Sequence, residues 1–495
     1  MVVVRMPKPA GVCRRSGTGC ARSEEDNGLI MNQFRIWVNW FWYGWAIGLV
    51  LSLALIIAIA PAPYFHDFGE WLYQGKILAL KITDSAAVAG FTVAPYPVPN
   101  SLAPVLLALL CLVLTPMVAG KVFLILLLAG WIWILWRFTC RFTLAENRGV
   151  ILVLLVAVIA LASFFWYGFI SYQLGLLLWF AFLTNFNERC SNNWIAGFGV
   201  ALFMSHAMVF LTWVPLVVLL ILASQPRQWR ILLALAPSGV LVLWFMLGRR
   251  LTGFDPPVAD ARMSGIAEIL LYKFGSPLLL GGFRNFLLPD GTSLFESQVW
   301  LYRLGAITNF LVVALLGVYI LQVFLKLNAG DNRNDASNLI SAPLEQSLRW
   351  FGWTLIAAYL IAPYNFFGLI NPGGRLLLPL LAVGLVLADR RILRWAQWAA
   401  IPAALGATLS VAAYGILMYR AGTEDLLTHA EIPSTAGPPS DSVFAFNDWL
   451  YRNTRYKYFN YRIFVLAERF AQLRASQFPG LAFRTGPITD YHSRP

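Results

Sequence analysis

Charged residues are scarce in this chain. Only 12% of its 495 residues are Asp, Glu, Lys or Arg, whereas soluble domains carry about 25%. The chain is also 59% hydrophobic, with a mean hydropathy of +0.66, so its apolar surface is too large for one water-soluble core. This composition excludes an ordinary soluble enzyme or binding module. It predicts an all-α, polytopic membrane protein, because a helix satisfies its own backbone hydrogen bonds within lipid.

Cysteine and histidine are also few. The sequence has 5 Cys and 4 His, with no Cys-x-x-Cys pair. Cys13 and Cys20 lie in a polar N-terminal stretch, and the other three lie in or beside apolar runs. No spacing is typical of zinc ligands, and no pattern indicates a framework of disulfides.

Acidic residues are outnumbered, and the net charge is +13. In a soluble protein this would indicate a nucleic-acid partner. Here Lys and Arg lie in short loops between apolar runs, where they orient helices relative to an anionic leaflet. We therefore expect no nucleic acid. Residues 1–35 lack the apolar core of a signal peptide, and we expect them to form a cytoplasmic, disordered tail.

The apolar runs predict about 11 transmembrane helices within residues 36–420. The expected spans are 37–60, 121–138, 149–168, 171–186, 193–206, 209–223, 230–248, 302–325, 350–369, 375–388 and 397–419. The apolar run 194–223 is too long for one untilted helix, so we divide it near His206. We expect outer loops at 63–120 and 249–300, a flexible inner linker at 326–349, and an extracytoplasmic tail at 421–495.

Residues 101–119 are apolar but short, with Pro104 and Pro116 within them. If they crossed the membrane, the arginines of 137–148 and 389–394 would lie outside. Because Lys and Arg accumulate on the cytoplasmic side, we interpret 101–119 as a re-entrant or interfacial segment. The N-terminus is then inside and the C-terminal tail outside.

Two carboxylates and a histidine follow the first span closely. His66, Asp67 and Glu70 lie within five residues and are interleaved with aromatic residues. On a helix, Asp67 and Glu70 would share a face. They fit either an interfacial helix with solvated acids or a carboxylate pair held at the membrane surface. The three side chains could also ligate a divalent metal, but so short a set establishes none.

A second candidate site lies at Arg375, which opens an apolar run. Arg375 could anchor a helix end by extending to the interface, or it could bind phosphate through two parallel hydrogen bonds. The preceding Gly373 and Gly374 favour close approach of another group to the backbone. Tyr364 and Asn365 could line the same cavity. We expect His206 to bond to neighbouring backbone, with a substrate contact as the alternative. Lys273, in the basic outer loop, could contact a phosphate, but a solvated side chain is the simpler expectation.

This arrangement resembles the GT-C superfamily of polyprenyl-phosphate-sugar-dependent glycosyltransferases. The likeness rests on a cytoplasmic N-terminus, an acidic outer loop after one span, many further spans, and an Arg before a Leu-Pro run at 375–379. The family often has Arg-Tyr where this chain has Arg375 and Leu376. The resemblance implies Asp67 as general base and Arg375 as the residue that binds the lipid phosphate. Glu70 is then either the second candidate for the base or a partner that orients the acceptor.

The resemblance also implies the partners and the location. The donor would be a lipid-phosphate-linked sugar and the acceptor a glycan, lipid or protein, in a multi-pass protein of a bacterial inner membrane. One alternative is a transporter or flippase of a lipid-linked substrate, which the absence of a recognisable inverted repeat disfavours. Another is an O-antigen ligase-like enzyme, which the absence of His from 249–300 disfavours.

Overall fold

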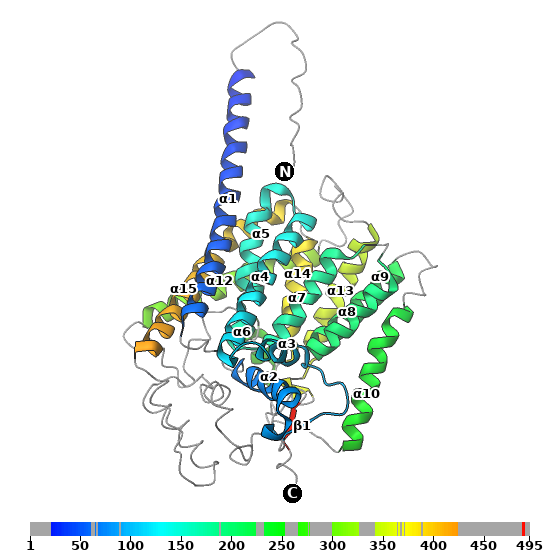
Figure 1. Ribbon diagram of the computed structural model, residues 1–495. Coiled ribbons are helices and arrows are strands. Elements are labelled where there is room, and N and C mark those ends of the chain that lie inside the picture. Colours follow the sequence, from blue (N-terminus) through cyan, green and yellow to red (C-terminus); the bar gives the residue numbers. More distant parts are fainter. Residues whose placement is uncertain are drawn as a thin grey trace, which may run out of the picture.

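The computed structural model is mainly helical (Figure 1). It describes residues 21–60, 65, 68–88, 91–187, 190–223, 232–252, 266–275, 277, 299–325, 342–363, 365–366, 369–370, 372–387, 390–423 and 488–490.

The N-terminal half consists of helices joined by short turns. They are α1 (Ala21–Ile59), α2 (Phe68–Thr83), α3 (Leu102–Cys111), α4 (Pro116–Phe142), α5 (Arg148–Leu155), α6 (Ser163–Trp166), α7 (Ile170–Asn185), α8 (Asn192–Ser205) and α9 (Ala207–Ala223). Shorter helical turns are η1 (Ser85–Val88), η2 (Ala145–Asn147) and η3 (Val156–Ala160).

The C-terminal half has longer intervals between helices. Its helices are α10 (Ala236–Thr252), α11 (Ile266–Gly275), α12 (Val299–Leu325), α13 (Ala342–Ile361), α14 (Pro372–Val386) and α15 (Arg390–Thr423). The described residues also include the short strands β1 (Phe91–Val93), β2 (Asn365–Phe366), β3 (Leu369–Ile370) and β4 (Ile488–Asp490).

Four helices of the described chain are long and apolar enough to cross a membrane. These segments are Ile36–Ile59, Pro116–Phe142, Leu232–Leu251 and Ala396–Ile416. Large apolar side chains on them are exposed, for example Leu51 on α1 and Leu243 on α10. Such faces are unfavourable in water and favourable in lipid. The helices therefore support a membrane protein, while the other expected spans coincide with shorter or interrupted helices.

The segment 101–119 contains a helix that is too short to span a bilayer. Helix α3 has ten residues, so it is about 15 Å long, compared with about 30 Å of hydrocarbon. It packs against α2, and both lie at the lower end of the bundle in Figure 1, below α4. Ideal Cβ placement at Gly75 of α2 is 2.7 Å from Leu107 Cβ, so only glycine allows this approach.

Several predicted boundaries are wrong. The segment 149–168 is not one helix, because α5 passes into a π turn at η3 and then into the separate α6. Helix α13 begins at Ala342 and ends at Ile361. The expected linker 326–349 is therefore helical from residue 342, and the expected span 350–369 stops short. The division at His206 is confirmed, because α8 ends at Ser205 and α9 begins at Ala207.

Two strand pairs lie outside the helices. Strand β4 pairs antiparallel with β1, with Thr92 opposite Thr489. The end of the chain therefore returns to the segment that follows α2. Strands β2 and β3 pair in a hairpin, with Asn365 opposite Ile370. The predicted span 350–369 extends into this hairpin, so that prediction is wrong at its C-terminal end.

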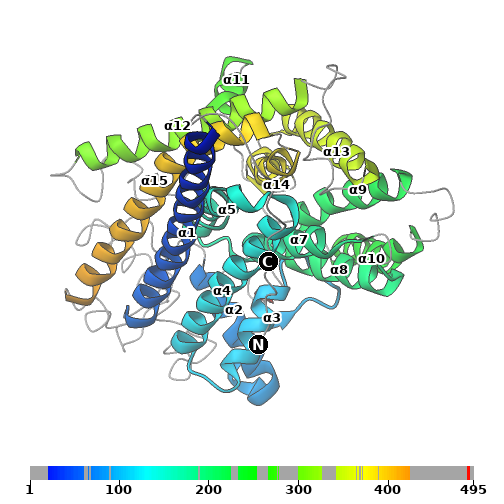
Figure 2. The same cartoon turned by 90° about the horizontal axis from the view of Figure 1, so that it is seen from above.

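Helices α7 and α14 lie towards the centre of the bundle in Figure 2. Helix α7 contacts α4, α8 and α9, and α14 contacts α9, α12 and α13. Helices α1, α5 and α15 pack together on one side. This arrangement brings the first turns of α7 and α14 together inside the protein.

Candidate functional site

Arg375 lies in the first turn of α14 and is buried, with 8% of its surface exposed. An arginine that only anchored a helix end would extend to water. Burial of a guanidinium is unfavourable unless polar or charged groups surround it. Its position inside the protein therefore favours a binding role over simple anchoring.

Two aromatic rings hold the guanidinium of Arg375. Its Cζ lies 5.2 Å from the centre of the Phe169 ring and 5.9 Å from that of Tyr172. The Tyr172 hydroxyl donates a hydrogen bond of 2.7 Å to the Arg375 carbonyl oxygen. Because a ring attracts the flat face of a guanidinium, these contacts stabilise the cation and still allow hydrogen bonds along its edge.

His206 extends the same cluster from the turn between α8 and α9. Its ring lies edge-on to Tyr172, with 5.2 Å between ring centres. Nδ1 accepts a 3.2 Å hydrogen bond from the Met208 N–H, as expected for a histidine bonded to neighbouring backbone. Because Nδ1 accepts this hydrogen bond, the imidazole is in the tautomer that carries its proton on Nε2.

Lys273 is buried, although the sequence predicted a solvated residue. It lies in the last turn of α11, and its Nζ donates to the carbonyl oxygens of Tyr359 and Ala362. The Tyr359 hydroxyl donates to the Lys273 carbonyl. This reciprocal contact fixes α11 against the end of α13, which withdraws Lys273 from water. Burial lowers the pKa of its ammonium group.

Gly373 brings the first turn of α14 close to Lys273. An ideal Cβ at this position would lie 3.2 Å from the Tyr359 ring and 3.6 Å from Lys273 Nζ. Lys273 and Arg375 are therefore both at the N-terminal end of α14. The backbone N–H groups of a helix N-terminus and two cations near the same helix end together favour an anion such as phosphate.

Aromatic side chains connect this cluster with the loop before α2. In α6, Phe164 packs on Tyr172 with 4.9 Å between ring centres, and the next residue, Phe165, packs on Phe65 at 5.2 Å. Phe65 and Phe68 are buried. Phe65 is thus held against α6, the same short helix that packs on Tyr172.

The segment between β1 and α3 also contacts the first turn of α7. The Ser171 hydroxyl lies 3.5 Å from the carbonyl oxygen of Asn100 and is oriented to donate to it. Asn100 has a positive φ of 71°, a conformation that asparagine tolerates better than most residues. Asn100, which precedes α3, therefore contacts the residue next to Tyr172, one of the aromatic neighbours of Arg375.

Several predicted site residues lie outside the described part of the chain. These are His66, Asp67 and Tyr364. For Glu70 and Asn365 only the backbone is described, in α2 and β2 respectively. Among the described residues, no group of three His, Cys, Asp or Glu side chains could hold a metal. The expected acid pair and its metal option stay predictions.

Comparison with known proteins gives no match. No protein-family model, curated protein or solved structure is significantly similar to this chain. The site must therefore be interpreted from its own chemistry. Sequence reasoning identified Arg375 and missed Tyr172, Phe169 and the burial of Lys273. A single lysine within the apolar run 265–280 was the only sequence signal for the last of these.

Proposed function

We propose that the protein is a membrane glycosyltransferase of the GT-C type, which moves a sugar from a polyprenyl-phosphate-linked donor to an acceptor on the extracytoplasmic face. The proposal includes about 11 spans in a bacterial inner membrane. The donor phosphate binds at the first turn of α14, where Arg375 and Lys273 are buried. The lipid chain extends into the bilayer.

The observation that carries the proposal is the position of Arg375. A buried guanidinium fixed between Phe169 and Tyr172, with a second buried cation at the same helix end, suits a phosphate better than a neutral ligand. Phe65, which precedes the predicted acids, is connected to this cluster through Phe165 and Phe164 of α6. This connection supports an acid of that loop as the base in the proposed reaction.

The reaction assigns one task to each group. The acceptor hydroxyl or amine attacks the anomeric carbon, and Asp67 takes its proton. Glu70 orients the acceptor. The bond between the anomeric carbon and the phosphate oxygen breaks, so negative charge develops on the departing lipid phosphate. Arg375 and Lys273 stabilise that charge in a site of low dielectric constant, where such interactions are strong.

Purified protein incubated with a panel of polyprenyl-phosphate sugars tests the proposal. Release of polyprenyl phosphate that depends on an added acceptor is the expected result. The transporter alternative predicts instead that a labelled lipid-linked sugar crosses the membrane of a proteoliposome intact. Movement of the lipid without release of phosphate would overturn the glycosyltransferase proposal in favour of that alternative.

A further inference from the structure

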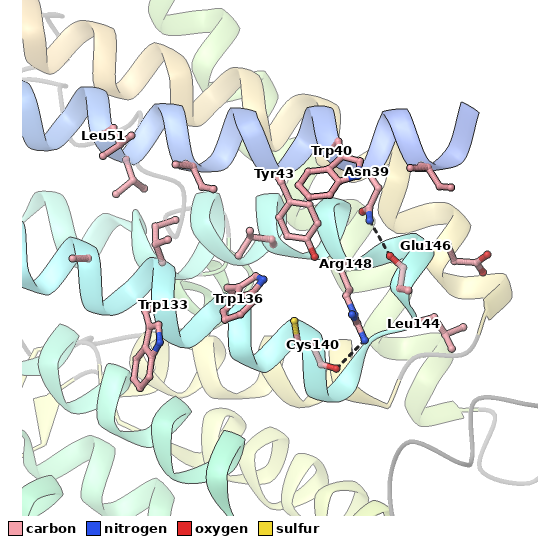
Figure 3. Close-up of a pocket in the computed structure, with 17 residues that line it drawn as sticks. Asn39, Trp40, Tyr43, Leu51, Trp133, Trp136, Cys140, Leu144, Glu146 and Arg148 are labelled. Carbon is pink, nitrogen blue, oxygen red and sulfur yellow. Dashed lines mark hydrogen bonds between the residues drawn. The ribbon is translucent and has the colours of Figure 1, made fainter. Parts of the chain in front are cut away.

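A groove of about 1050 Å³ lies between α1 and α4 (Figure 3). Most of its walls are apolar, for example Val50, Leu51 and Ala129. At one end, Asn39 joins α1 to the corner between α4 and α5: its Nδ2 donates to the Ala145 carbonyl at 2.8 Å, and its Oδ1 accepts from the Gly149 N–H. These bonds fix α1 to the α4–α5 corner at that end, so they fix the position of one wall of the groove relative to the other.

The open side of the groove faces the region where lipid would lie. Both of its long walls come from segments that are long and apolar enough to span a membrane. Large side chains along it remain exposed: Trp40 is 69% exposed, Leu51 63% and Trp133 55%. Tryptophan concentrates at the interface between the hydrocarbon and the head groups. The apolar part of the groove therefore suits an acyl chain, with its polar end at the interface.

The polar end of the groove carries positive charge. Arg148 donates from Nε to the Thr143 carbonyl at 3.2 Å and from Nη2 to the Cys140 carbonyl at 3.1 Å. These acceptors are neutral, so the charge of Arg148 is not cancelled by them. Arg137 lies over the Trp133 ring, 5.3 Å from its centre. Arg148 and Glu146 line the groove itself, and Arg137 lies at its rim over the ring of Trp133, which does line it. These three side chains leave a net positive charge at this end.

The groove is distinct from the site at Arg375. Arg141, near the same end of α4, donates to the carbonyl of Thr184 in the last turn of α7. Tyr172, which donates to the Arg375 carbonyl, lies in the first turn of α7. These positions are about 18 Å apart along the helix. The polar end of the groove and the Arg375 site therefore lie towards opposite membrane faces.

We propose that this groove binds an anionic phospholipid of the cytoplasmic leaflet. One acyl chain lies between α1 and α4, and the phosphate contacts Arg148 and Arg137. Basic pockets between helices on the cytoplasmic side recognise anionic head groups in this way. The bound lipid fills the space between the first span and the rest of the bundle.

Native mass spectrometry of the full-length protein with added phosphatidylglycerol or phosphatidylcholine tests the proposal. The wild type should retain phosphatidylglycerol in preference. Arg137→Gln should weaken that lipid about fivefold, which corresponds to one surface cation, and Ala129→Phe should displace both lipids by filling the groove. Arg250→Gln and Ala412→Phe, at exposed positions on α10 and α15, are the matched controls.

A photoactivatable phosphatidylglycerol with its reactive group in the acyl chain locates the site independently. Crosslinks should map to peptides within 36–59 and 116–142, and Ala129→Phe should abolish them. Equal retention of the two lipids by the wild type, or crosslinks that survive Ala129→Phe, would overturn the proposal.

Discussion

Arg375 is buried, contacts two aromatic rings and lies at a helix N-terminus. In the proposed sugar transfer, its positive charge is the property that stabilises the departing phosphate. Replacing it with Ala removes the cation that stabilises the departing phosphate. We expect transfer to fall by about 10²- to 10³-fold, the cost of losing one preorganised charge-stabilising group. Arg375→Lys should recover only part of the rate, since lysine lacks the planar fork. Steady-state kinetics with varied donor provide the measurement. An Ala variant with unchanged donor kinetics would reduce Arg375 to a helix anchor.

Lys273 makes the same site sensitive to alkaline pH. An exposed lysine has a pKa of about 10.4, and burial lowers the pKa of Lys273. As pH rises, this residue therefore loses its proton before an exposed lysine does, and donor affinity falls. We expect an alkaline limb in the pH profile of kcat/KM. Lys273→Arg should move that limb to higher pH, because guanidinium stays protonated. Identical profiles for both proteins would exclude Lys273 from phosphate binding.

Asp67 is the residue to which the resemblance assigns the general base. Asp67→Asn keeps the size of the side chain and removes the base, so transfer should fall by about 10²- to 10⁴-fold. Glu70→Gln should cost less if Glu70 only orients the acceptor. Sugar transfer is measured at equal expression. An active Asp67→Asn protein beside an inactive Glu70→Gln protein would move the base to Glu70, and full activity in both would remove this loop from catalysis.

At the scale of elements, α2 packs closely on α3 within the predicted outer loop 63–120. Gly75→Ala adds one methyl group where an ideal Cβ already lies 2.7 Å from Leu107 Cβ. We expect destabilisation of about 1–3 kcal/mol from overpacking. Gly44→Ala is the matched control, because nothing lies within 4 Å of its ideal Cβ and it gains the same helix propensity. Thermal unfolding in detergent compares them. Equal melting temperatures would show that α2 and α3 separate easily.

At the scale of the whole molecule, the arginine distribution predicts which ends of the helices lie on the cytoplasmic side of the membrane. Ser85, in η1, should lie on the extracytoplasmic side, and Asn193, at the start of α8, on the cytoplasmic side. Single cysteines at these exposed positions, in a variant without the five native cysteines, can be labelled with a membrane-impermeant thiol reagent in intact cells. Position 85 should react and position 193 only after lysis. Reaction of both positions in intact cells would mean that residues 101–119 cross the membrane, because position 193 would then also lie outside.

Features that depend on composition or on neighbours in sequence could be predicted from the sequence. The scarcity of charge indicated helices in lipid, and the position of Arg375 after two glycines marked it as a binding candidate. The change of helix at His206 followed from the length of the apolar run. The π turn at η3 and the end of α13 before the β2–β3 hairpin could not be predicted, because the apolar runs continue through both.

The sequence by itself determined the class of protein and identified Arg375 as a site residue, because hydropathy and charge are properties of short segments. Only the tertiary structure decided which residues share the site. Tyr172 and Arg375 are 203 positions apart, and Lys273 and Tyr359 are 86 apart. Each pair meets because helices from distant parts of the chain pack together. Whether a lone lysine or histidine in an apolar segment is buried depends on that packing, and no local pattern encodes it.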